Sequence, residues 1–413
     1  MTYSQTVRYF KERLPGAVQA ASLPEIGMEV VTPSFTSRFH EAAPAGNEYQ
    51  GLSSFFRALL KYYLARNESS NSYLLRNLEV ADEQVEENTR FHYPLFLPRG
   101  TGRARSVILL LHGLNERSWD KYFPWAARLA SGTGSAVVLF PLSFHMNRAP
   151  ASWSNPRLAR KIAQERQDLF PDLHGSSFAN VAISTRLQLV PQRLCYSGLQ
   201  TLKDIGDLAS EVRRDTHRFI EPGARIDIFG YSIGGMIGEI LLLADTERLF
   251  ADSRLLLFCS GSTLDRSYPV SRSILDSEAF TAIAGFYGVD FRARAESDDR
   301  LRETLSRHAA EAEVFSWMIH SSVNPQRRLS RLDRIRNRIA SISLSRDRVM
   351  PPLSILESVN GSASPRPGLD RELDFPFSYS HESPFPAVSP GSGDVDSAFE
   401  QTFSLASEFL GAS

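Results

Sequence analysis

The chain has 413 residues, of which 42% are hydrophobic and 23% charged, and its formal net charge at pH 7 is -1. This composition is typical of a soluble globular protein with enough apolar residues for a sizeable core. The near-zero charge removes the electrostatic argument for binding nucleic acid or a membrane surface. Cys195 and Cys259, the two cysteines, lie outside any C-x-x-C pattern, which argues against disulfides and a cysteine zinc site.

The first part of the chain carries few signals. Met1–Gly16 has no apolar signal-peptide segment, and the sequence holds no run of about 18 apolar residues. We therefore expect a cytoplasmic protein without a membrane span. Residues 1–89 are expected to form an N-terminal extension, in which the spacing of apolar residues over Leu52–Arg66 predicts an amphipathic helix.

From residue 90 onward, short apolar runs alternate with helical patterns. This alternation predicts a mostly parallel central sheet with helices on both faces, because parallel strands are buried on both sides. The expected strands are Phe91–Leu97, Ser106–Leu111, Ser135–Pro141, Arg225–Tyr231, Arg254–Cys259, Ile339–Leu344 and Leu373–Tyr379. The expected helices are Phe123–Ala130, Leu202–Phe219, Ile233–Ala244, Leu301–Met318 and Asp396–Leu410.

Two intervals between expected strands are too long for simple crossovers. Residues 144–196 are expected to fold over an edge of the sheet, and residues 262–338 are expected to form a helical cap. The α/β core then consists of residues 90–261 and 339–413. The two long intervals are expected to shape any substrate pocket.

The motif with the most chemical content is Gly230-Tyr231-Ser232-Ile233-Gly234, which matches G-x-S-x-G. It lies where an expected strand meets an expected helix, the setting of a nucleophile elbow. There a sharp turn lifts the serine hydroxyl clear of the sheet, and the flanking glycines avoid steric clashes. The helix N-terminus behind the serine offers N–H groups to a developing oxyanion.

With this element the chain resembles the α/β-hydrolase superfamily, in its serine-nucleophile form. In that superfamily a strand that ends in His-Gly precedes the loop whose backbone binds the oxyanion, and Val107–Leu114 is similar to this element. The resemblance implies that the backbone N–H groups of Leu114 and Ile233 form the oxyanion hole. His112 is expected to be a buried turn histidine rather than the catalytic base.

The superfamily order of serine, acid and histidine can be followed further. Asp347 lies just past the expected strand Ile339–Leu344, and His381 is the one histidine that follows it, just beyond the expected strand Leu373–Tyr379. The resemblance thus implies the triad Ser232, Asp347 and His381. Asp265 is the alternative acid, because some members of the superfamily place the acid after the preceding strand.

The triad implies a serine hydrolase that acts on a carboxylic ester or thioester through an acyl-enzyme. Its partner is a small-molecule acyl substrate, and no cofactor or metal is expected, because phosphate-loop, zinc and dinucleotide-binding motifs do not occur. Two alternatives remain open: an acyltransferase or peptidase on the same triad, and a non-catalytic binding protein of the same fold. The sequence does not fix the oligomeric state.

Two weaker signals concern substrate contacts. His145 and Arg148 follow an expected strand at the same edge as Ser232, so contact with substrate is one interpretation of them and an ordinary loop is the other. Between Arg327 and Arg338 six arginines occur within twelve residues. They are interpreted either as a solvated helix face or as a site for an anionic substrate group, such as that of a coenzyme A thioester.

Overall fold

The protein is built on a 9-stranded central sheet with the order β1-β2-β5-β7-β6-β8-β9-β10-β11. The computed structural model describes residues 1–14, 20–39, 82–288, 291–386 and 393–412. Neighbouring strands from β7 to β11 are parallel, and β1, β2 and β5 form an antiparallel edge. The strands are β1 (Ala21–Leu23), β2 (Met28–Val31), β5 (Leu95–Pro98), β6 (Ala104–Leu111), β7 (Ala136–Leu139), β8 (Ile220–Tyr231), β9 (Leu255–Phe258), β10 (Ile339–Leu344) and β11 (Asp370–Leu373).

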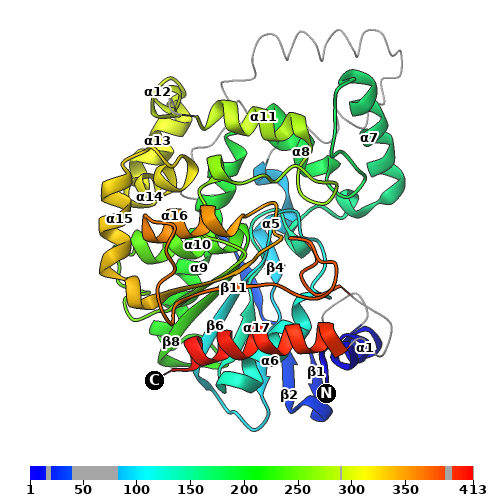
Figure 1. Cartoon of the computed structure of the whole chain (residues 1–413), viewed down its shortest axis with the longest axis vertical. Helices are drawn as coiled ribbons and strands as arrows, with labels where there is room; N and C mark the ends of the chain where they lie inside the picture. The colour runs from blue at the N-terminus through cyan, green and yellow to red at the C-terminus, as the bar shows by residue number, and fades with distance from the viewer. Residues whose placement is uncertain (15–19, 40–81, 289–290, 387–392, 413) are drawn as a thin grey trace.

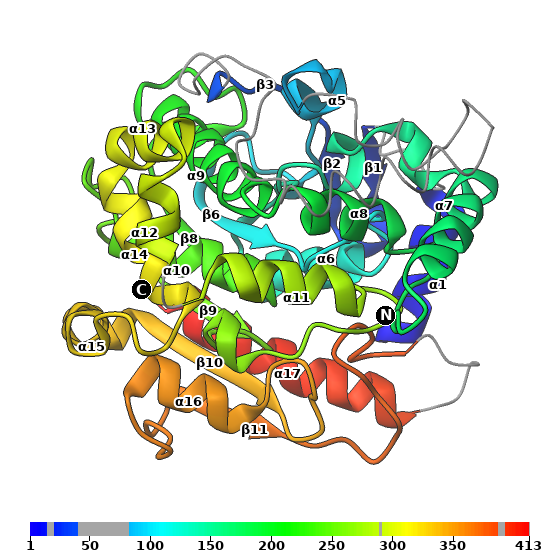
Figure 2. The same cartoon turned by 90° about the horizontal axis from the view of Figure 1, so that it is seen from above.

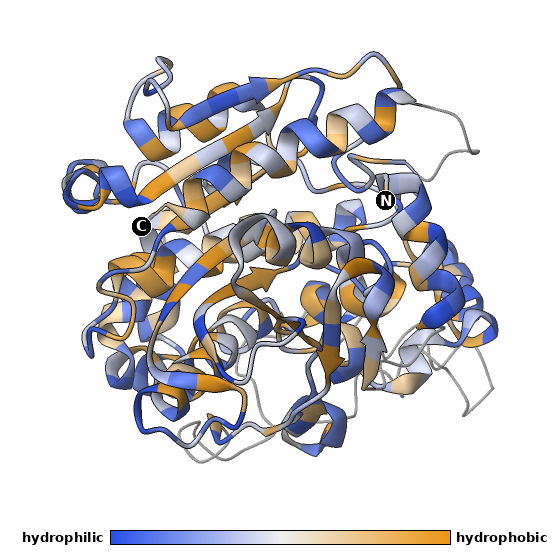
Figure 3. Ribbon diagram, turned by 90° about the horizontal axis from the view of Figure 1, so that it is seen from below, coloured by the Kyte–Doolittle hydropathy of each residue, from blue (hydrophilic) through white to orange (hydrophobic). Residues whose placement is uncertain are grey.

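Successive strand residues point to opposite sides of the sheet. Both faces of the sheet are apolar and are covered by helices. In β6, Val107 and Leu109 belong to one apolar core and Ile108 and Leu110 to the other. Apolar residues are accordingly concentrated on the central strands (Figure 3). One face is covered by α1 (Tyr3–Arg13), α6 (Tyr122–Thr133) and α17 (Gly393–Gly411), and the other by α9 (Arg193–Arg213), α10 (Ile233–Leu243) and α16 (Pro352–Asn360).

The two ends of the described chain lie side by side in α1 and α17 (Figure 1). The backbone N–H and the hydroxyl of Ser4 both donate to Asp396, each over 2.8 Å. The Tyr3 ring stacks on Phe399 at a centroid distance of 4.3 Å. The helix nearest the beginning of the chain is therefore fixed by the helix nearest its end.

Parts of both long intervals cover the carboxyl end of the sheet, whereas residues 325–334 of the second pack against α16. Figure 2 looks onto this end and shows α11 crossing it beside α8, with α12, α13 and α14 grouped to one side. The first interval contains η3 (Met146–Arg148), η4 (Ala151–Ser154), α7 (Pro156–Leu169) and α8 (Val181–Leu189). The second contains η5 (Leu264–Arg266), α11 (Ser277–Phe286), α12 (Phe291–Glu296), α13 (Asp299–Arg307), α14 (Ala309–Ile319), α15 (Pro325–Arg334) and η6 (Arg336–Arg338).

The predicted mostly parallel α/β architecture is confirmed, and the strand order with a strand–serine–helix turn after β8 is that of the α/β-hydrolase fold. The remaining elements are η1 (Pro24–Ile26), β3 (Ser34–Thr36), η2 (Asp82–Gln84), α5 (Glu86–Thr89) and β4 (Arg90–His92), where β3 and β4 form a separate two-stranded sheet. Among the described residues, no helix is both long enough and apolar enough to span a bilayer.

The N-terminal segment differs from expectation. Residues 1–89 were predicted to lie outside the core, whereas β2 pairs with β5 and β1 with β2 in the central sheet. The pairing of Met28 with Pro98 joins segments 70 residues apart, which a reading of local patterns does not detect. The helix predicted over Leu52–Arg66 lies outside the described residues.

Two predicted strands are wrong in extent. Phe91–Leu97 is divided into β4 and β5 around Pro94, whose missing N–H interrupts a strand. Leu373–Tyr379 is a strand only up to Leu373. Beyond it the Arg346 guanidinium binds the carbonyls of Phe375 and Phe377, so a side chain replaces the neighbouring strand as their partner.

Two predicted helices also have other bounds. The helix expected over Leu202–Phe219 is α9, which begins at Arg193 and ends at Arg213. It therefore begins within the interval 144–196. The helix expected over Leu301–Met318 is divided into α13 and α14 at His308, which has a non-helical backbone (φ -117°, ψ 45°).

Candidate active site

Ser232 occupies a strained turn between β8 and α10. Its φ of 55° and ψ of -127° lie outside the regions that non-glycine residues favour. The turn closes tightly over the sheet: a Cβ on Gly234 would lie 2.3 Å from the carbonyl oxygen of Leu111, and one on Gly230 would lie 2.4 Å from the Cα of Gly235. The G-x-S-x-G spacing thus supplies glycine where any side chain would clash.

A continuous chain of hydrogen bonds connects Ser232 with a histidine and an acid. His381 Nε2 lies 2.8 Å from Ser232 Oγ, and His381 Nδ1 lies 2.7 Å from Asp347 Oδ2. All three residues are buried, at 6%, 3% and 4% exposure for Ser232, His381 and Asp347. The carboxylate requires a proton on Nδ1, so Nε2 is free to accept the serine proton.

Asp347 and His381 are each held in place by further contacts. Asp347 Oδ1 accepts the backbone N–H groups of Val349 and Met350 at 2.8 and 2.9 Å, which leaves Oδ2 for the histidine. The Tyr231 ring stacks on His381 with centroids 5.4 Å apart, and its hydroxyl donates to the His381 carbonyl. The loop after β11 therefore holds the imidazole in one orientation over β8.

Burial raises the pKa of the Cys259 thiol, and the negative charge of Asp347 raises it further. The thiol lies beside the acid at the end of β9, and it stays protonated at neutral pH. It is a weak hydrogen-bond donor that faces the carboxylate. Sequence reasoning assigned no role to Cys259, since a lone cysteine after a strand gives no signal of its partner.

The alternative acid, Asp265, lies in a different environment. It accepts the backbone N–H and the hydroxyl of Ser321 at 3.0 and 2.6 Å and lies 3.6 Å from His320. The His381 ring forms its hydrogen bonds with Asp347 and Ser232. The geometry thus favours Asp347 as the acid.

The loop that carries Leu114 follows β6 and is held by Asn115. Asn115 has a φ of 61°, and its side-chain amide donates to the carbonyls of Ala179 and Ser273 over 3.0 and 2.6 Å. Ile233 is the first residue of α10, where backbone N–H groups lack helical acceptors. Leu114 lines the cavity that contains Ser232 as well as a second, smaller cavity, and Ile233 lines the smaller one.

His112 is a fully buried turn residue, as the sequence suggested. Its Nδ1 donates to the carbonyl of Gly113 over 2.8 Å, and its Nε2 accepts the backbone N–H of Leu142 over 3.0 Å. Burial lowers its pKa well below the ordinary histidine value. The ring therefore connects the ends of β6 and β7, and both of its nitrogens have hydrogen-bond partners.

Two cavities lie near Ser232, and Leu114 belongs to the wall of both. One has a volume of about 310 Å³, contains Ser232 and His381 in its wall, and is lined by charged and polar side chains together with apolar ones such as Leu114 and Ile274. The other has a volume of about 50 Å³ and is mainly apolar. Its lining includes Leu114, Ile233, Leu142, Leu199, Met236 and Phe315. Ser232 and His381 belong to the wall of the first cavity, and the second cavity shares Leu114 with it.

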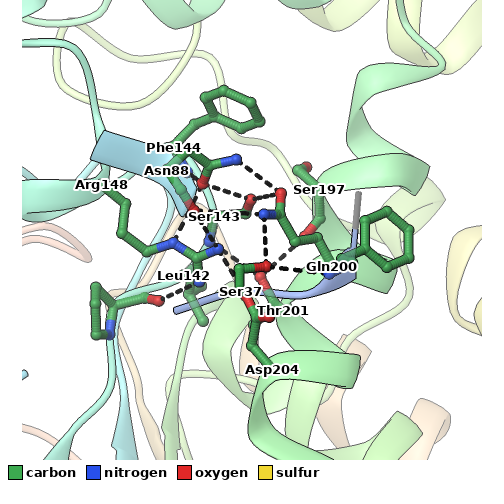
Figure 4. A network of polar contacts seen from close by, with 12 residues as sticks. Ser37, Asn88, Leu142, Ser143, Phe144, Arg148, Ser197, Gln200, Thr201 and Asp204 are labelled. Atoms are coloured by element: carbon green, nitrogen blue, oxygen red, sulfur yellow. Dashed lines mark hydrogen bonds and ion pairs between the residues drawn. The ribbon is translucent and has the colours of Figure 1, made fainter. Parts of the chain in front are cut away.

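Of the two predicted substrate contacts, His145 lines the apolar cavity, where its Nδ1 donates to the Ser143 carbonyl over 2.8 Å. For Arg148 the structure favours the other interpretation, a loop residue without substrate contact. Arg148 has 0% exposure and pairs with Asp204 at 2.7 Å. Figure 4 shows it within a buried polar network with Asn88, Ser143 and Gln200, which fixes the loop after β7 from beneath.

Five of the six arginines between Arg327 and Arg338 contact the protein itself, namely Arg327, Arg328, Arg331, Arg336 and Arg338. Arg327 pairs with Glu313 at 2.9 Å, Arg331 donates to the Leu243 carbonyl, and Arg338 donates to the Phe250 carbonyl. Residues 327–338 do not line either cavity beside Ser232. The structure therefore favours the solvated helix face over an anion site beside Ser232, although Arg328 is buried.

The structure also brings charged residues to the site that sequence reasoning missed. Glu116, Arg117 and Lys121 line the cavity that contains Ser232, and they follow β6. The available signal was their position, since charged loop residues just beyond the carboxyl end of a parallel strand are candidates for ligand contacts. Among the described residues, no group of three or more His, Cys, Asp or Glu side chains is placed to hold a metal ion.

The buried His145 makes the fold sensitive to acid. Burial lowers its pKa to about 4, below the value of about 6.5 in an unfolded chain, so the unfolded chain binds the proton more readily. The free energy of unfolding is expected to fall as the pH drops from 7 towards 4, with His145 contributing about 2 kcal/mol of the loss at pH 5. Urea unfolding at pH 7 and pH 5 measures this loss, and His145→Gln should reduce it by that amount; an equal loss in both proteins would contradict the assignment.

Comparisons with known proteins find one family model and distant solved structures. A family model described as "Family of unknown function (DUF6051)" matches residues 1–411. No curated protein matches the chain. Similar solved structures include carboxyl esterase 2 from the fungus Tuber melanosporum (11% identity over 85% of this chain and 98% of that one, TM-score 0.41) and a thermostable esterase from Pseudomonas putida (10% identity, 89% and 100%, TM-score 0.44). A carboxylesterase from Lactobacillus plantarum shares 13% identity over 78% of this chain and 95% of that one, with a TM-score of 0.37.

Proposed function

The chain belongs to the DUF6051 family, and we propose that it is a serine hydrolase that cleaves a carboxylic ester or thioester through an acyl-enzyme. The observation that carries the proposal is the buried chain of hydrogen bonds from Ser232 through His381 to Asp347 at a strained strand–helix turn. A serine hydroxyl is a weak nucleophile unless a neighbouring base takes its proton, and this arrangement supplies that base.

In the proposed mechanism, Ser232 Oγ attacks the substrate carbonyl carbon while its proton passes to His381 Nε2. Asp347 stabilises the resulting imidazolium through Nδ1–H. The N–H groups of Leu114 and Ile233 donate to the carbonyl oxygen as it becomes negatively charged. The tetrahedral intermediate collapses, the leaving alcohol or thiol takes the proton from His381, and Ser232 remains acylated.

Deacylation repeats these steps with water as the nucleophile. His381 takes a proton from water, whose oxygen attacks the acyl carbon, and the Ser232 Oγ–acyl bond breaks as the proton returns to Oγ. The products are a carboxylic acid and the regenerated enzyme. The burial of the three residues supports this scheme, because hydrogen bonds to a developing charge are stronger where water is excluded.

Labelling with a fluorophosphonate probe, followed by peptide mass spectrometry, tests the proposal. An activated Ser232 forms a bond to phosphorus and displaces fluoride, so the wild type should be modified at Ser232. His381→Ala should lose this modification, and Ser232→Ala should remain unmodified at the elbow. Labelling that persists in folded His381→Ala, or that is spread over other serines, would contradict an activated nucleophile.

A panel of 4-nitrophenyl and acyl-thioester substrates then measures turnover. Release of nitrophenol or thiol by the wild type, and its absence in Ser232→Ala, is the expected result. Circular dichroism of each variant shows whether a loss of labelling comes from the site or from unfolding. A folded wild type that is neither labelled nor turns over any ester would favour a binding protein of this fold.

A further inference from the structure

Arg117 is a cation in the wall of the cavity that contains Ser232 and His381. Within the part of the chain that the structure describes, it forms no ion pair, and its guanidinium donates to two neutral oxygens, the Trp153 carbonyl and Asn115 Oδ1. Its charged group also lies 6.0 Å from the centre of the Trp153 ring. The side chain is therefore held in position by neutral partners alone.

The other charged groups of the cavity are already engaged. Lys121 pairs with Glu116 and also donates to the Glu382 carbonyl over 3.1 Å. Burial raises the pKa of the Glu382 carboxyl, and the hydroxyls of Ser271 and Ser380 contribute to an overall lowering of it. Arg117 is thus the cation of this wall that lacks a carboxylate partner among the described residues.

An arginine without a counter-ion in a partly buried position is costly for the protein. Burial lowers the pKa of Arg117 to about 10, so the side chain remains charged at neutral pH. A guanidinium has five N–H donors in a fork that matches a carboxylate or phosphate, and two acceptors leave most of this fork unused. An anionic group in the cavity would supply the missing charge and acceptors.

We propose that Arg117 is a specificity residue that binds an anionic group, of the carboxylate type, on the substrate. The inference rests on the proposed function, because it places this group in the same cavity as the reacting serine. The substrate is then an ester or thioester that carries a carboxylate in its acyl part or in its alcohol part.

Two pairs of matched esters distinguish these two positions of the charge. In the acyl pair, mono-4-nitrophenyl glutarate is compared with 4-nitrophenyl pentanoate, which has the same number of acyl carbons and no charge. In the alcohol pair, 4-acetoxybenzoate is compared with 4-tolyl acetate. We expect Arg117→Gln to lower the ratio of kcat/KM for the anionic ester to that for the neutral ester at least about tenfold in one pair.

The ratio separates recognition from support of the loop. Arg117 also holds Asn115, so its replacement is expected to affect both esters of a pair if its role is only structural, and the ratio would then stay constant. Arg117→Lys keeps the charge without the fork and should give an intermediate ratio. Arg105→Gln is the matched control, because it removes the same charge at a side chain with 86% exposure outside the cavity.

A binding measurement decides the inference independently of turnover. Calorimetric titration of Ser232→Ala with glutarate and with benzoate should show binding of one of them, and that binding should weaken at least about tenfold in Ser232→Ala/Arg117→Gln. Binding that depends on Arg117 without any ester turnover would refute the proposed hydrolase and keep the anion site. Turnover with an unchanged ratio in both pairs, or no binding of either anion, would overturn the role of Arg117.

Discussion

Asp347→Asn is expected to lower kcat for hydrolysis of a neutral ester about 10⁴-fold, whereas Asp265→Asn retains nearly full activity. Asparagine has nearly the shape of aspartate, so the hydrogen bonds from Val349 and Met350 can persist. It cannot stabilise the imidazolium, however, and its amide can hold His381 in the wrong tautomer. Asp265 contacts Ser321, and its replacement removes no partner of the His381 ring.

Steady-state kinetics with 4-nitrophenyl butyrate measure both variants, with wild type and Ser232→Ala as upper and lower references. Thermal unfolding of the same samples shows whether either replacement disturbs the fold. If Asp265→Asn loses activity while Asp347→Asn keeps it, the triad acid is Asp265 and the geometry around His381 does not represent the reactive state. Equal and small effects of both would argue against a triad acid at either position.

The second large effect concerns stability: Arg148→Met is expected to lower the free energy of unfolding by about 3–5 kcal/mol. Arg148 and Asp204 are buried, at 0% and 1% side-chain exposure. Burial raises the pKa of Asp204 and Arg148 opposes this rise, so desolvation outweighs the attraction within the pair. Removing one partner leaves the other charge buried and uncompensated.

The double variant Arg148→Met/Asp204→Leu should regain most of this loss, because neither side chain is then charged. Urea unfolding of the two single variants and the double variant measures the coupling between the residues. Arg13→Met is the control: Arg13 pairs with Glu25 at 3.1 Å with exposures of 58% and 45%, and exposed pairs contribute at most about 1 kcal/mol. A double variant less stable than either single one would show that the network of Figure 4 needs the charges themselves.

The sequence was most informative where local pattern and chemistry coincide. Ser232 lies at a strand–helix junction that both the apolar pattern and the G-x-S-x-G spacing indicate, and the structure places a strained turn there. The resemblance implied Asp347 and His381 through the superfamily order of serine, acid and histidine, and the structure brings both within hydrogen-bond distance of their partners. Their catalytic roles remain part of the proposal.

Features that depend on distant pairing could not be predicted. Arg148 follows a strand at the correct edge, but its burial depends on Asp204, which lies 56 residues later on α9. The short strands β1 and β2 become recognisable only next to β5. The proposed role of Arg117 likewise depends on its neighbours in the fold. Its acceptors are neutral, and Glu116 in the same wall pairs with Lys121.

The contact between α1 and α17 has a consequence for the order of folding. Ser4 and Asp396 are separated by 392 positions, so α1 emerges from the ribosome long before its partner is translated. During this time the apolar side chains Tyr3 and Phe10 have no complete core to enter, and such exposed surface favours aggregation. This face of the sheet can therefore be closed only after translation has passed α17, and contacts of such long range slow the final step of folding.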